Sequence, residues 1–125
     1  DSEQGSVIVV VGTDAPLLPY QLKRLARRVS LGLARTGAVS GNGSGDLFLA
    51  FSTANTGAWS PGETARVDML GNDQLDPVFA AVVEATEEAV VNALVAGRNM
   101  TGHLGRRVIA LPHDRLRAVL KQYGR

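Results

Sequence analysis

The strongest constraint on the fold is an uninterrupted, mostly β-branched run near the start of the chain, Ser6-Val-Ile-Val-Val-Val-Gly-Thr13. Apolar side chains occupy both alternating sets of positions in this run. A strand with that pattern is covered on both faces, so it lies in the middle of a layered structure. We therefore expect residues 6–13 to form a buried strand.

Helical periodicity follows directly after two prolines, Pro16 and Pro19. Apolar residues recur at intervals of four, three, four and four residues, at Leu18, Leu22, Leu25, Val29 and Leu33. This spacing predicts one amphipathic helix that starts at Pro19 and carries most of its basic residues on the opposite face. A basic helix could bind nucleic acid. However, 13 Lys and Arg against 12 Asp and Glu give a net charge of +1, which favours an ordinary solvated face.

The rest of the chain predicts few strands for its helices. A glycine-rich loop precedes a second buried strand at residues 46–52, and residues 53–74 read as loops with one short strand near 65–70. Asp76-Pro77 starts a helix that runs to Gly97 and carries Val78, Val82, Ala85, Ala89 and Ala93 on one face. An extended piece at 106–111 and a helix at 112–121 complete the chain. Such a small sheet leads us to expect further strands from another polypeptide.

Composition excludes several classes of protein. The 125 residues suit one domain, and no apolar run approaches the roughly 18 residues of a membrane span. The chain has no Cys, which removes thiol catalysis, disulfides and thiolate metal sites, and its two His residues form no zinc motif. We expect no cofactor, no nucleic-acid partner and no membrane partner. The chain starts without Met or a signal peptide, so we expect it to be part of a longer translation product; the compartment stays open between cytoplasm and periplasm.

Ser6 is the first candidate for chemistry, because Gly5 precedes it and a buried strand follows it. If the Gly5–Ser6 bond were cut, Ser6 would carry an α-amino group beside its own hydroxyl. That amine titrates near 7.7–8.0, so it could act as the general base without a histidine. Glycine before the serine would tolerate the strained backbone of self-cleavage. The alternative is that Ser6 merely begins a strand.

A second candidate lies in the stretch Gly41-Asn-Gly-Ser-Gly-Asp46. Its glycines precede a strand and no Lys-Ser/Thr pair follows them, which argues against a phosphate-binding loop. Ser44 and Asp46 are two residues apart and would project from the same side if the strand begins there. A hydroxyl backed by a carboxylate forms a short relay, although the same composition is typical of ordinary turns.

These two signals recur together in one known arrangement. From Gly5 to Tyr123 the chain resembles the C-terminal (β) chain of the L-aminopeptidase D-esterase/amidase (DmpA-type) family, which includes the β-peptidyl aminopeptidases. The resemblance rests on Gly5-Ser6 and its strand, residues 13–28, Gly32-Leu-Ala-Arg-Thr-Gly37, residues 41–46, Phe51-Ser-Thr-Ala-Asn55, Asn99-Met-Thr-Gly102 and Ala110-Leu-Pro112.

The resemblance implies an α/β (α+β) fold, an αββα sandwich of the DmpA/ornithine-acetyltransferase type that a separate N-terminal α chain completes. It implies self-cleavage between Gly5 and Ser6, with residues 1–5 as a residual precursor segment and 6–125 as the β chain of a single domain. Ser6 matches the nucleophile, Ser44 a serine that moves protons near it, and Asp46 the supporting acid. The oxyanion-hole and substrate-ammonium residues of the family lie mostly in the absent α chain.

The implied function is a self-processing serine aminopeptidase or amidase that removes the N-terminal residue from peptides, aminoacyl amides or esters, as a homo-oligomer of αβ units. One alternative is an amide hydrolase of the nylon-oligomer type on the same fold, although those enzymes use Thr as nucleophile. Another is a non-catalytic assembly or binding domain. His103 and His113 are expected at the surface, and Trp59 in a pocket or, preferably, a subunit contact.

Overall fold

A computed structural model describes residues 5–62 and 64–125. Residues 1–4, which form most of the expected precursor segment, lie outside the described residues, as does residue 63. The chain divides into two compact units, Asp1–Glu87 and Glu88–Arg125, and each is described by itself. The assignment of residues 6–125 to a single domain stays a prediction.

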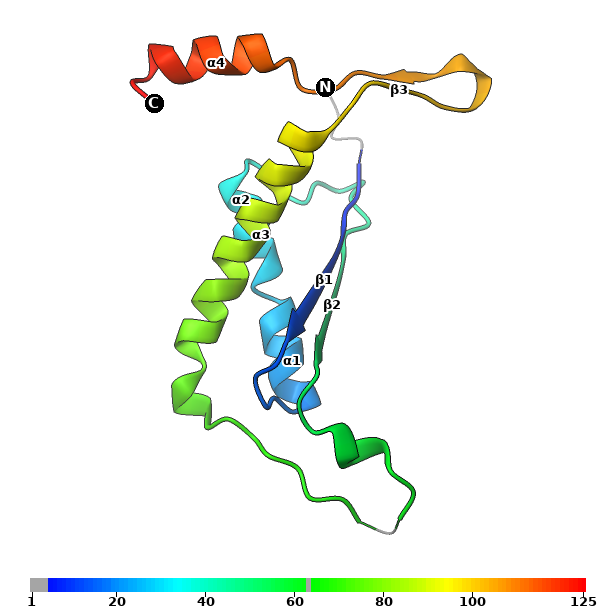
Figure 1. The fold of residues 1–125 in the computed structure, drawn as a ribbon, viewed down its shortest axis with the longest axis vertical. Coiled ribbons are helices and arrows are strands. Elements are labelled where there is room, and N and C mark those ends of the chain that lie inside the picture. Colours follow the sequence, from blue (N-terminus) through cyan, green and yellow to red (C-terminus); the bar gives the residue numbers. More distant parts are fainter. Residues whose placement is uncertain (1–4, 63) are drawn as a thin grey trace. The chain divides into compact units, whose positions relative to one another are not determined.

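The first unit is built on two parallel strands, β1 (Ile8–Thr13) and β2 (Leu47–Ser52), with Ile8 opposite Leu47 and Thr13 opposite Ser52. Parallel strands need a crossover, which α1 (Pro19–Ala26) and α2 (Val29–Arg35) provide (Figure 1). Both predicted strands are confirmed, and so is the mixed α/β class.

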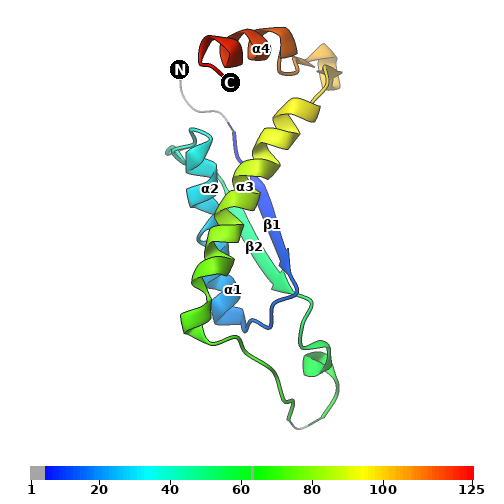
Figure 2. The same cartoon turned by 60° about the vertical axis from the view of Figure 1, so that its left-hand side comes forward.

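Helices cover one face of this two-stranded sheet. Figures 1 and 2 show α1, α2 and the beginning of α3 (Asp76–Ala96) on the same side of β1 and β2. The buried core between them is apolar and consists of Leu17, Leu25, Val29, Leu33, Leu75, Phe79, Val82 and Val83. Of the apolar face predicted for α3, only Val82 is buried within this chain; Phe79 and Val83 are buried beside it, whereas Ala85, Ala89 and Ala93 are exposed.

The predicted single helix from Pro19 is divided in two at residues 27–28. The Arg28 guanidinium donates a hydrogen bond to the Arg24 carbonyl (2.9 Å) and lies 3.7 Å from the centre of the Phe79 ring. Arg24 lies over the same ring at 5.1 Å. Two of the basic residues that suggested a nucleic-acid interface therefore pack against an aromatic ring of α3.

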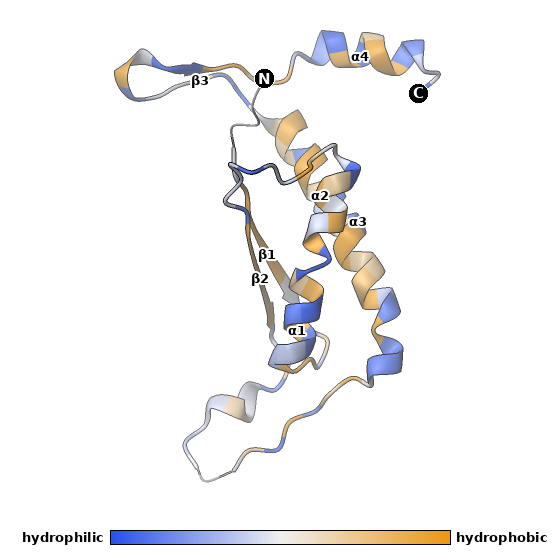
Figure 3. Cartoon of the chain, turned by 180° about the vertical axis from the view of Figure 1, so that it is seen from behind, coloured by the Kyte–Doolittle hydropathy of each residue, from blue (hydrophilic) through white to orange (hydrophobic). Residues whose placement is uncertain are grey.

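The opposite face of the sheet is exposed and apolar. Its side chains come in cross-strand pairs, Ile8 with Leu47 and Val10 with Leu49, and they are 72%, 64%, 56% and 59% exposed respectively. The ring of Phe51 continues this face over Gly12. Figure 3 shows both strands in apolar colours. Within this chain the expected cover on both faces is therefore present on one face only.

Residues 53–74 contain no strand at 65–70, where one was expected, among the residues that the structure describes. Short 3-10 helices, η1 (Thr56–Trp59) and η2 (Asn72–Gln74), interrupt the loop instead. Side chains replace a strand ladder here: Asn55 exchanges two hydrogen bonds with the Asp68 backbone (2.9 and 2.8 Å). The buried Gln21 side chain donates to the Leu70 carbonyl at 2.8 Å. These side-chain hydrogen bonds fix the loop backbone in place, although the loop forms no strand.

The second unit contains the rest of α3, a hairpin of β3 (Met100–Thr101) and β4 (Arg107–Val108), the 3-10 helix η3 (His103–Gly105) and α4 (His113–Gln122). The extended piece and the last helix are confirmed, whereas β3 was not expected. His103 and His113 are exposed, as predicted. No helix among the described residues is long and apolar enough to cross a membrane.

Candidate functional site

The parallel register of β1 and β2 brings the two predicted site segments together. Ser6 lies just before β1, and residues 44–46 lie just before β2. Parallel strands begin at the same edge of a sheet, so residues 39 positions apart in sequence become neighbours. The Leu47 amide continues the pairing by donating to the Val7 carbonyl at 3.0 Å. The site therefore sits where both strands start.

Ser6 is exposed and is held through its hydroxyl oxygen. The Gly45 backbone N–H donates to Ser6 Oγ at a donor–acceptor distance of 2.8 Å. A Cβ at position 45 would lie 3.3 Å from that oxygen, which is tighter than an ordinary contact. Glycine at this position therefore lets the backbone approach the candidate nucleophile closely.

The Asp46 carboxylate links the start of β2 to the start of β1 through a hydrogen bond. Its Oδ1 accepts a hydrogen bond from the Val7 N–H (2.9 Å), and its Oδ2 accepts one from the Ser40 hydroxyl (3.2 Å). The Ser44 hydroxyl, followed by the Val7 N–H and then Ser40, holds the pKa of Asp46 below its ordinary value of 3.8. The carboxyl is therefore ionised at neutral pH.

Ser44 lies in the turn before β2 and not in the strand itself. Its amide donates to the Gly41 carbonyl at 2.8 Å, and its hydroxyl bonds to the Asp46 carboxylate. The structure thus brings Ser44 and Asp46 together, as the spacing indicated, although the geometry is that of a turn. Ser6 joins this segment through the amide of Gly45.

Sequence reasoning missed two members of the site, Ser40 and Gly45. Ser40 adopts a left-handed backbone with φ of 47°, which few residues other than glycine adopt, and this places its hydroxyl on Asp46. Gly45 was one of several glycines in the loop, and its special position follows only from strand register. No local signal distinguished either residue.

This arrangement supplies a hydroxyl that could act as a nucleophile, a backbone donor to that hydroxyl, and an ionised carboxylate with two further hydroxyls around it. With the Gly5–Ser6 bond intact, the Ser6 nitrogen is an amide and cannot accept a proton. Cutting that bond would create an amine at the same place, with a pKa near 7.7–8.0. No cluster of His, Asp and Glu that could hold a metal occurs among the described residues.

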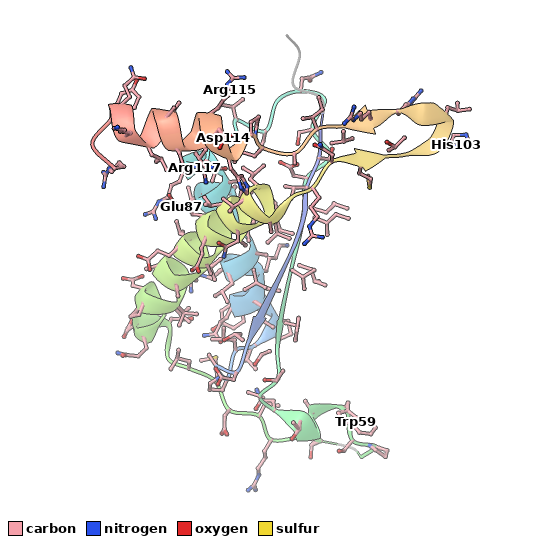
Figure 4. All side chains as sticks on the ribbon, turned by 45° about the horizontal axis from the view of Figure 1, so that its top comes forward. Trp59, Glu87, His103, Asp114, Arg115 and Arg117 are labelled. Atoms are coloured by element: carbon pink, nitrogen blue, oxygen red, sulfur yellow. The ribbon has the colours of Figure 1, made fainter. Side chains whose placement is uncertain are left out.

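A separate groove lies at the other end of the strands, beside the loop after β2. It has a volume of about 610 Å³, and its lining includes Leu17, Leu22, Ser52, Asn55, Trp59 and Val67. Trp59 is 83% exposed, and Figure 4 labels it on η1. The structure thus places Trp59 in a groove away from Ser6, while its role in a subunit contact stays a prediction.

Comparison with known families decides the relationship. The model of "Peptidase family S58" matches residues 1–108. This chain belongs to peptidase family S58. The resemblance drawn from its motifs is confirmed.

Several S58 relatives are similar over nearly the whole chain. The curated β-peptidyl aminopeptidase BapA of Sphingosinicella microcystinivorans is 52% identical over 122 residues, which are 97% of this chain and 31% of the relative. The L-aminopeptidase D-Ala-esterase/amidase from Ochrobactrum anthropi, described as a variant of the Ntn-hydrolase fold, is 51% identical with a TM-score of 0.84. That match covers 94% of this chain and 34% of the solved one.

A β-aminopeptidase from a Burkholderia species superposes with a TM-score of 0.80 at 46% identity, over 94% of this chain and 35% of its own. This chain therefore shares the fold of S58 structures. It also spans only about a third of the length of the curated relatives that it matches. This fraction agrees with one part of a longer, two-part precursor.

Proposed function

We propose that this chain is the nucleophile-bearing β part of a self-processing S58 aminopeptidase or amidase. The observation that carries the proposal is the pair of contacts across 39 residues, Gly45 N–H to Ser6 Oγ and Val7 N–H to Asp46. They join the residues on both sides of the proposed nucleophile to the Ser44–Asp46 segment. The names of the relatives support aminopeptidase chemistry.

Processing uses the Ser6 hydroxyl first. Oγ attacks the Gly5 carbonyl carbon, the C–N bond breaks, and the Ser6 nitrogen takes a proton to become an amine. Water then hydrolyses the ester between Gly5 and Oγ, which releases a Gly5 carboxylate and restores the hydroxyl. Ser44 and Asp46 orient the segment and assist proton transfer.

Turnover repeats the same chemistry on a substrate. The new α-amine of Ser6 accepts the hydroxyl proton while Oγ attacks the carbonyl of the substrate's N-terminal residue. The leaving amine departs with a proton, and water hydrolyses the acyl-enzyme. The substrate class is peptides, aminoacyl amides or esters with a free N-terminal residue. No cofactor takes part in these steps.

The partner of this chain is the N-terminal α part of the same precursor. The exposed apolar face of β1 and β2 supports this, because five large side chains on one face need cover that this chain does not supply. Burying each such side chain stabilises by roughly 1.5–3 kcal/mol. The α part would complete the αββα sandwich, and αβ units would assemble into a homo-oligomer.

Mass spectrometry of the purified full-length protein tests the proposal. We expect a fragment that begins at Ser6, and activity on a panel of aminoacyl amides and β-peptides. Ser6→Ala should abolish both cutting and turnover, because one hydroxyl serves each. Preference for aminohexanoate oligomers would favour the nylon-oligomer alternative. An intact, inactive wild-type chain would favour a non-catalytic assembly domain.

A further inference from the structure

We infer that the backbone N–H of Gly45 is a catalytic hydrogen-bond donor to the nucleophile, stabilising negative charge as it develops on Ser6 Oγ. This inference rests on the proposed function, in which Ser6 Oγ is the reacting atom. Its basis is the 2.8 Å contact between the two groups in the intact chain.

The position of this donor is fixed on both sides. Before it, the Ser44 amide closes a turn onto the Gly41 carbonyl at 2.8 Å. After it, the Asp46 carboxylate accepts from the Val7 N–H, on the residue next to the nucleophile. The N–H of Gly45 therefore points at Ser6 Oγ before any reaction starts, and no reorganisation is needed when charge appears.

The bond from Gly45 leaves the Ser6 hydroxyl free to react. A serine hydroxyl has one O–H donor and two lone pairs. The Gly45 N–H occupies one lone pair, which leaves the other for attack on a carbonyl carbon and the proton for transfer to the Ser6 amine.

The strength of this bond changes during the reaction. A hydrogen bond to an anionic oxygen is roughly twice as strong as one to a neutral oxygen. The Gly45 contact is therefore strongest when Oγ approaches an alkoxide, during attack and during release from the acyl-enzyme. An interaction that strengthens only in the transition state raises kcat without tightening substrate binding.

Glycine at position 45 also leaves space beside the nucleophile. An added Cβ would lie 3.3 Å from Ser6 Oγ and 3.9 Å from Ser6 Cβ. Gly45→Ala would keep the N–H but would crowd Ser6 Oγ with the added methyl group. Replacing Gly45 by glycolic acid would remove the N–H and add no atoms, so the two changes separate donation from space.

The test uses the full-length precursor, made by in vitro translation with glycolic acid at position 45. The matched control carries glycolic acid at Gly43, in the same loop. We expect slower self-cleavage and a kcat on aminoacyl amides lower by roughly 10- to 100-fold, as for the loss of one hydrogen bond to a charged oxygen. KM should stay within about twofold, because the bond gains strength only as charge develops. The melting midpoint should lie within about 4 °C of the control's, because only one exposed neutral hydrogen bond is lost from the ground state. Gly45→Ala should slow both reactions through crowding.

Parental cleavage and kcat with the ester at position 45 would overturn the inference. A melting midpoint more than about 4 °C below that of the Gly43 ester, or a loss confined to KM, would assign a structural or binding role and overturn the inference too. A precursor that keeps the control's midpoint but is not cut would support it. The Ser6→Ala precursor separates the two proposals. If this precursor still cuts itself and turns over substrate, the proposed function fails. If it is inactive while the precursor with the ester at position 45 is fully active, only the role of Gly45 is refuted.

Discussion

The packing of α2 against α3 depends on Gly32, and Gly32→Ala should destabilise the protein. A Cβ at this position would lie 2.6 Å from both Thr86 Cβ and the Val83 carbonyl oxygen, about 1 Å short of an ordinary contact. Neither atom is the end of a flexible side chain, so the helices themselves must separate. Separation would loosen the buried contacts of Val29 and Leu33.

The magnitude follows from two opposing effects. Overpacking of this kind costs up to about 3 kcal/mol, while replacing a helical glycine by alanine returns about 1 kcal/mol. The net loss is therefore about 2 kcal/mol in the free energy of unfolding. The m-value rises with protein size, and the curated relatives are about three times as long as this chain. With an m-value of about 4 kcal/mol/M for the full-length precursor, the urea midpoint should fall by about 0.5 M.

Urea unfolding of the full-length precursor is the measurement. It is made in a Ser6→Ala background, which would prevent the proposed cut and keep the protein as one covalent chain. Ser30→Ala, on the exposed side of α2, is the matched control and should change stability by less than about 0.5 kcal/mol. Adding Thr86→Ala to Gly32→Ala should not restore stability, because Val83 O and the β-carbon at position 86 remain. An unchanged or higher midpoint for Gly32→Ala would refute the steric reasoning.

Four further predictions concern the fold and the site. Gln21→Leu should lower the free energy of unfolding by about 1–3 kcal/mol, because the partly buried Leu18 N–H and Leu70 carbonyl lose their partner; urea unfolding checks this against Lys23→Leu at an exposed position. Ser44→Ala and Asp46→Asn should each lower kcat by roughly 100-fold on protein confirmed to be cut, with a double variant little worse than either; parental rates on aminoacyl amides would contradict the relay. Because the pKa of Asp46 is lower in the folded chain than its ordinary 3.8, its stabilisation should be complete above that pH and be lost as the pH falls through the lowered value. Asp46→Asn should flatten this part of the stability profile, and an unchanged slope would count against the hydrogen bonds around the carboxyl. Residues 6–125 expressed alone should aggregate or stay partly unfolded in light scattering, whereas a monodisperse fragment with a cooperative melt would show that no partner is needed.

The strands were predictable because their signal is local. The β-branched run after Ser6 needs no knowledge of the rest of the chain, and β1 covers residues Ile8–Thr13 of it. The break between α1 and α2 was not predictable, since Arg28 stacks on Phe79, a residue 51 positions away in sequence. The expected strand at 65–70 failed for a similar reason, because the side chains of Asn55 and Gln21 bind that backbone from elsewhere.

The candidate site was also predictable only in part, for the same reason. Ser6, Ser44 and Asp46 were named from their local setting and from the family resemblance, and the structure brings their segments together; their catalytic roles stay predictions. Ser40 and Gly45 could not be named, because their contacts depend on how β1 pairs with β2. A hydroxyl or a glycine in a flexible-looking loop has no distinguishing pattern until the register is known.

If the chain is processed as proposed, the parallel pairing of β1 with β2 makes cleavage depend on folding. A contact between Ser6 and Gly45 closes a loop of 39 residues that includes the crossover helices α1 and α2. A precursor in which that contact has not formed would offer Ser6 Oγ no donor from Gly45, and we expect such a chain to stay uncut. The appearance of the Ser6 terminus would then report that β2 has paired with β1. The fraction of cut chain would report the fraction of molecules that have folded.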